Sequence, residues 1–68
     1  GVTMSEWRVD VPGGTTQTVE AVKMEVTQRG DLVFWDAEGT CIRAFATSAW
    51  IGCEQVKKSV HYGYGRAA

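Results

Sequence analysis

The fold of this chain is decided by the stretch Val19-Glu20-Ala21-Val22-Lys23-Met24-Glu25-Val26. Apolar and polar residues alternate along it with a period of two, which is typical of β-strands that bury one face. The alternation changes phase in the middle, because Val19 and Ala21 share one parity whereas Met24 and Val26 share the other. A one-residue slip turns every later side chain to the opposite face, so we expect a bulge or corner near Ala21-Val22. Such a corner bends a small sheet.

The same alternation extends in both directions from this stretch. Residues 6–11 alternate cleanly and end at Pro12-Gly13-Gly14, where proline and glycine favour a turn. Further strands are predicted over residues 16–21, 22–26, 32–36, 41–46 and from 50 to between 53 and 56, with glycine-containing turns at 29–31 and 37–40. Since no stretch has a convincing helical period, the sequence predicts an all-β fold.

The predicted architecture is a small barrel or a strongly bent antiparallel sheet of five to six short strands. This layout, with its Leu32-Val33-Phe34-Trp35 strand, resembles small barrels of the SH3-like type, and the resemblance concerns architecture alone. With 68 residues the chain makes one domain at most. We expect a disordered N-terminus over residues 1–4, interpreted as a cloning remnant before Met4, a β-barrel domain over 5–56 and a flexible basic and aromatic tail over 57–68. The predicted core consists of Trp7, Val9, Val11, Val19, Val22, Met24, Val26, Leu32, Phe34, Ile42, Ala44 and Trp50.

The charge is divided unevenly along the chain. Residues 1–54 hold eight acidic and four basic side chains, a net charge of −4, whereas residues 55–68 hold three basic side chains and no acid. An acidic body is repelled by phosphate, which counts against general nucleic-acid binding by the globular part.

Two predicted strands are apolar on both faces. In the strand over residues 32–36, Leu32 and Phe34 point to one face and Val33 and Trp35 to the other. The strand over residues 41–46 also has apolar residues on both faces. A strand of this kind is usually covered on both sides. The second face could be covered by the chain's own tail, by a second copy of the chain or by another protein. We therefore expect a non-enzymatic protein–protein interaction or self-assembling module whose partner-binding residues are Val33, Trp35, Cys41, Arg43 and Phe45.

The alternative function is binding of single-stranded nucleic acid, RNA in particular. Trp35, Phe45 and Arg43 would form a stacking platform, helped by the aromatic and basic residues 61–66 of the tail. The basic groove that such proteins use is missing from the body of the sequence.

No catalytic constellation, cofactor motif or metal-ligand set is recognisable in the sequence. Cys41 and Cys53 are expected on neighbouring strands, where they could pair or act as small buried hydrophobes. A zinc site needs four ligands, and only His61 is available as a third. We expect no cofactor, no metal and no small-molecule substrate. Since there is no membrane-spanning run or signal-peptide pattern, we expect a cytoplasmic protein without a membrane partner.

Overall fold

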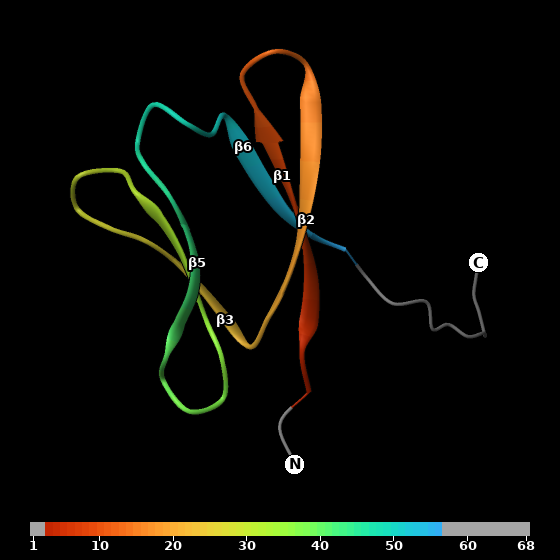
Figure 1. The fold of residues 1–68 in the computed structure, drawn as a ribbon, viewed down its shortest axis with the longest axis vertical. Helices are drawn as coiled ribbons and strands as arrows, with labels where there is room; N and C mark the ends of the chain where they lie inside the picture. Colours follow the sequence, from red (N-terminus) through yellow and green to blue (C-terminus); the bar gives the residue numbers. More distant parts are fainter. Residues whose placement is uncertain (1–2, 57–68) are drawn as a thin grey trace, which may run out of the picture.

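A computed structural model describes residues 3–56, which form six strands and no helix (Figure 1). The strands make two antiparallel three-stranded sheets of order β2-β1-β6 and β3-β4-β5, called the first and second sheet below. Their bounds are β1 Ser5–Val11, β2 Thr15–Ala21, β3 Lys23–Val26, β4 Leu32–Trp35, β5 Cys41–Phe45 and β6 Gly52–Val56. The predicted all-β class is confirmed, whereas neither sheet closes into a barrel. The predicted tail lies outside the described residues. Within residues 3–56 there is no helix of the length and hydropathy that would cross a membrane.

The predicted corner is where the chain passes from one sheet to the other. Ala21 is the last residue of β2 and pairs with Ser5 in the first sheet. Lys23 is the first residue of β3 and pairs with Trp35 in the second sheet. Only Val22 lies between them, and its N–H donates to the carbonyl of Trp35 at 2.9 Å. The change of phase is therefore confirmed, and it marks a change of sheet.

The core lies between the two sheets. Its buried members are Val9, Val19 and Ala21 from the first sheet and Leu32, Phe34 and Phe45 from the second. The ring of Phe34 meets those of Trp7 and Phe45 edge to face, with centroids 6.0 and 6.3 Å apart. The predicted core residues Val9, Val19, Leu32 and Phe34 are confirmed as buried, and Trp7, Val11, Met24 and Trp50 pack against them partly buried.

Three predicted core residues lie at the surface. Val26 is 50% exposed because it ends the edge strand β3, and Ile42 is 41% exposed. Ala44 is exposed as well, because it pairs with Val33 on the side of the second sheet away from the core. Phe45 takes the inward place instead, since it pairs with buried Leu32.

The connection between β5 and β6 is attached to the turn between β3 and β4. The N–H of Thr47 donates to Asp31 Oδ1 at 2.9 Å, and Trp50 Nε1 donates to the carbonyl of Gly30 at 2.9 Å. Gly30 has a φ of +95°, which side chains rarely adopt, and a Cβ placed on it would lie 2.6 Å from Thr47 Oγ1. These contacts hold the turn of the second sheet against the segment that returns to the first.

Candidate interaction face

The second sheet has an outer face, the side that points away from the core. Residues paired across neighbouring strands share a face of the sheet. On this side Trp35 pairs with Lys23, and Val33 pairs with Glu25 on one neighbouring strand and with Ala44 on the other. Val33 and Trp35 are half-buried and Ala44 is exposed. The outer face is defined here by Lys23, Glu25, Val33, Trp35, Cys41, Ile42 and Ala44.

A bulge in β5 brings Cys41 onto the outer face. Phe34 pairs with Arg43, but the next residue of β4, Trp35, pairs with Cys41, so Ile42 is the extra residue. Two residues of β5 thus oppose one of β4, which is the arrangement of a β-bulge. Cys41 and exposed Ile42 therefore both lie beside Trp35.

Trp35 is held in place by two side chains of β3. Its Nε1 donates to Glu25 Oε1 at 3.2 Å, and Lys23 Nζ lies 5.8 Å from the centroid of its ring. The first contact satisfies the polar edge of the indole, and the second is a cation–π interaction. The apolar ring is consequently presented in one orientation between an anionic and a cationic group.

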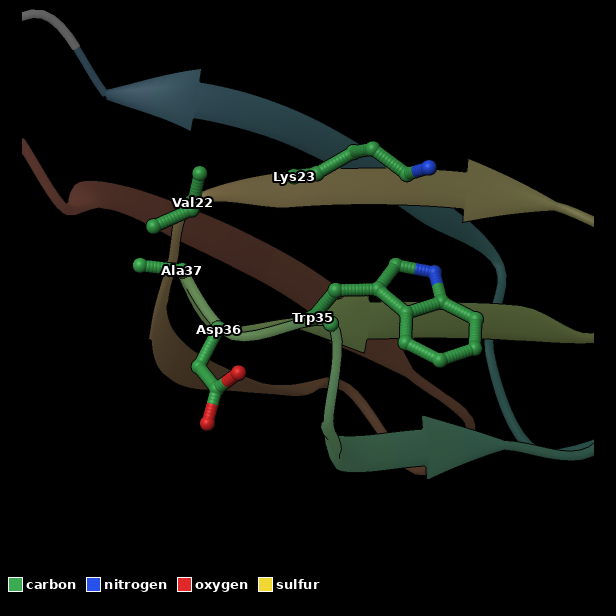
Figure 2. A pocket seen from close by; sticks show the side chains of 6 residues that line it. Val22, Lys23, Trp35, Asp36 and Ala37 are labelled. Carbon is green, nitrogen blue, oxygen red and sulfur yellow. The ribbon is translucent and has the colours of Figure 1, made fainter. Parts of the chain in front are cut away.

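A hollow of about 320 Å³ opens next to Trp35, where the corner meets the turn between β4 and β5 (Figure 2). In Figure 2 the Lys23 side chain extends alongside the indole, while Val22 and Ala37 are both at one end of the hollow. Its lining residues are Val22, Lys23, Trp35, Asp36, Ala37 and Gly39.

Asp36 shapes the turn that borders the hollow. Its Oδ1 accepts hydrogen bonds from the N–H groups of Glu38 and Thr40, both at 2.9 Å. Gly39 has a φ of +81° and donates its N–H to the Asp36 carbonyl at 3.2 Å. An aspartate that accepts from nearby backbone N–H groups is a common way of closing a tight turn. The wall of the hollow is therefore built by local hydrogen bonds.

The structure brings together three of the five residues predicted to bind a partner. Val33, Trp35 and Cys41 share the outer face. The prediction that Phe45 and Arg43 join them is wrong. Phe45 is only 7% exposed and belongs to the core. The guanidinium of Arg43 lies over the Phe45 ring, 4.7 Å from its centroid, and donates to Gln17 of β2.

This placement also removes the predicted stacking platform for nucleic acid, since Trp35 and Phe45 lie on opposite sides of the sheet. Ile42 and Ala44, predicted to point into the core, are instead exposed on the outer face, and the hollow is a feature that the sequence did not predict. The sequence does contain one sign of this ambiguity: β5 has apolar residues on both parities, so either of its faces could point into the core.

The two cysteines lie in different sheets, so the expectation that their strands are neighbours is wrong. Both thiols are free, Cys41 exposed on β5 and Cys53 half-buried on β6. Burial raises the pKa of the Cys53 thiol, and the nearby carboxylates of Asp10 and Glu54 raise it further. No three potential metal ligands cluster among residues 3–56, and His61 lies outside that part of the chain.

The outer face is suited to contact with another apolar surface. Its aromatic and aliphatic side chains are bordered by Lys23 and Glu25, one charge of each sign, which resembles the apolar centre and polar rim of protein interfaces. Comparisons with models of protein families, with curated proteins and with solved structures found no match.

Proposed function

We propose that this domain is a non-enzymatic protein–protein interaction module that binds through the outer face, with a second copy of the chain as the partner. One observation carries the proposal. The buried side chains of the second sheet, Leu32, Phe34 and Phe45, all lie on its inner side, yet Trp35 and other apolar residues occupy the outer side as well. A sheet with one solvated face normally has polar residues there.

The energy available from such a face permits an association of moderate affinity. An apolar patch of about 600 Å² stabilises a complex by on the order of 15 kcal/mol before costs, at about 25 cal/mol per Å². Association itself costs about 4–15 kcal/mol in lost freedom of the partners. The net gain is therefore about 0–11 kcal/mol, which permits a dimer that separates on dilution.

Charge supports a protein partner over nucleic acid. The described residues carry four basic and eight acidic side chains, a net charge of −4. The Arg43 guanidinium is already engaged, because it lies over the Phe45 ring and donates to Gln17. Phosphate binding needs a cluster of cations that can reach the backbone of the nucleic acid. An apolar contact that tolerates salt fits this surface better.

The test is the solution mass of the full chain, measured by light scattering over a hundredfold range of concentration at low and high salt. Ile42→Lys places a charge on the outer face at a residue that is already exposed, so it should give a monomer without unfolding the domain. Ile51→Lys is the matched control, because Ile51 is 69% exposed on the connection between β5 and β6. We expect the control to associate like the unmodified chain.

Two results would contradict the proposal. A monomer at every concentration rejects a second copy as the partner. Tight binding of single-stranded RNA that weakens steeply with salt would instead favour the nucleic-acid alternative. Trp35→Ser should abolish association while the fold remains, and unfolding of this variant would mean that Trp35 supports the domain instead of a partner.

A further inference from the structure

We propose that the hollow beside Trp35 is the docking site of the chain's own C-terminal segment, residues 57–68, with Tyr62 or Tyr64 inserted between Val22, Ala37 and the indole. The contact goes beyond the proposed function and does not depend on it. Only one consequence rests on that function, namely that the segment competes with the partner for the outer face.

The first support is the place where the described chain ends. Val56, the last residue of β6, pairs with Glu6 of β1, and Glu6 pairs on its other side with Glu20 of β2. Neighbouring strands are about 4.8 Å apart, so Val56 lies about 10 Å from Glu20. Glu20 is two residues before Val22, the corner residue that lines the hollow. The segment therefore starts at most about 17 Å from the corner, the roughly 10 Å across the sheet plus two residues of strand.

The second support is the length of the segment. Tyr62 and Tyr64 follow Val56 by six and eight residues. At about 3.3 Å per extended residue they reach about 20 and 26 Å from it. Both distances exceed the roughly 17 Å between Val56 and the corner, and Tyr64 has the greater excess for a path around the sheet edge.

The third support is charge complementarity. The lining of the hollow includes one acidic residue, Asp36, and one basic residue, Lys23. Two further acidic residues are close to it, Glu38 in the same turn and Glu25 against the Trp35 indole. The segment carries three basic residues and no acidic one. These residues are Lys57, Lys58 and Arg66. Opposite charges within about one Debye length attract each other, and salt weakens that attraction.

The chemistry of the hollow suits a tyrosine ring. Val22, Ala37 and the Trp35 indole supply apolar and aromatic surface, while Lys23 and Asp36 supply polar groups. Tyrosine combines a large apolar ring with a hydroxyl that seeks a polar partner, and aromatic rings favour contact with an indole. Ring and hydroxyl therefore both find matching groups at this site.

The test is a set of nuclear Overhauser contacts measured by NMR on the full, unmodified chain. Both tyrosines of the protein lie in the segment, so every contact between a tyrosine ring and a methyl group reports on it. We expect contacts to the methyl groups of Val22 and Ala37 that weaken at high salt, and none to the control methyls of Ile51. Absence of the hollow contacts, or equal contacts to Ile51, would overturn the proposal. Contacts seen only between differently labelled copies in a mixed sample would also overturn it.

A double substitution checks the same contact independently. Tyr62→Ser combined with Tyr64→Ser should shift the indole N–H resonance of Trp35 and leave that of Trp50 unchanged. If neither resonance moves, the segment does not occupy the hollow. Light scattering separates this result from the proposed function: the double variant should self-associate several-fold more tightly if both hold. Hollow contacts in a chain that stays monomeric would uphold this inference and reject the second copy as partner.

Discussion

Gly30→Ala should destabilise the domain through two separable effects at one position. Gly30 has a φ of +95°, and an added Cβ would lie 2.6 Å from Thr47 Oγ1. Holding a residue with a side chain at positive φ costs about 1–2 kcal/mol. Forcing an atom into occupied space costs about 1–3 kcal/mol more. We therefore expect Gly30→Ala to lower the free energy of unfolding by about 2–5 kcal/mol. A domain of this size has only about 3–10 kcal/mol in total.

Gly39→Ala is the matched control for the backbone effect. Gly39 also has a positive φ, +81°, but nothing lies within 4 Å of a Cβ placed there. Gly39→Ala should therefore lower the free energy of unfolding by the backbone strain alone, about 1–2 kcal/mol. The difference between the two variants isolates the clash with Thr47.

Thr47→Ala makes the clash itself testable. This substitution removes Oγ1 and leaves the Thr47 Cβ at 3.5 Å from the added atom, an ordinary van der Waals distance. In the Thr47→Ala background, Gly30→Ala should therefore be no more harmful than Gly39→Ala. The double-mutant cycle should give a coupling of about 1–3 kcal/mol between positions 30 and 47.

The assay is urea unfolding followed by tryptophan fluorescence, in which Trp50 reports directly because its Nε1 donates to the Gly30 carbonyl. A shift of the midpoint at constant slope gives the change in stability. Equal losses for Gly30→Ala and Gly39→Ala, or a coupling near zero, would refute the packing of the β5–β6 connection on this turn.

Three further outcomes are expected from the described residues. Phe34→Ala removes a fully buried ring and should reduce the free energy of unfolding by about 3–5 kcal/mol in the same urea assay; a loss below about 1 kcal/mol would show that Phe34 is not central to the core. Arg8→Ala removes an exposed ion pair with Glu54, 2.7 Å long, and should reduce it by less than about 1 kcal/mol, with no difference left at 1 M salt. Folding raises the pKa of the Cys53 thiol from an ordinary 9.0, so the unfolded chain loses this proton first and the free energy of unfolding should fall as pH rises above 9.0. In Cys53→Ala the free energy of unfolding should fall less steeply from below to above pH 9.0, and equal slopes in the two proteins would contradict the burial of this thiol.

The strands and their turns could be predicted from local sequence. Alternation along residues 6–11 and the Pro12-Gly13-Gly14 stop act within a few residues, so they need no knowledge of distant partners. The change of phase at Ala21-Val22 was likewise visible, because parity is a property of the strand itself. What the parity could not show is that the chain changes sheet there, since this depends on the pairing of Ala21 with Ser5 and of Lys23 with Trp35.

The candidate site was only partly predictable. Val33 and Trp35 were placed together correctly, because they follow each other at a spacing of two in one strand. The hollow was not found, since it joins the corner at Val22 to the turn at Ala37, which are far apart in sequence.

The sequence by itself determined that this chain is all-β, where its strands run and at which residue it turns a corner. Only the tertiary structure decided that two open sheets form and which face of β5 is buried. With apolar residues on both parities of β5, either face could point inward. The pairing of Phe45 with buried Leu32, together with the bulge beside Trp35, turns Phe45 inward and Ala44 outward. This arrangement is favoured because Phe45 fills the core against Phe34, whereas Ala44 is too small to do so.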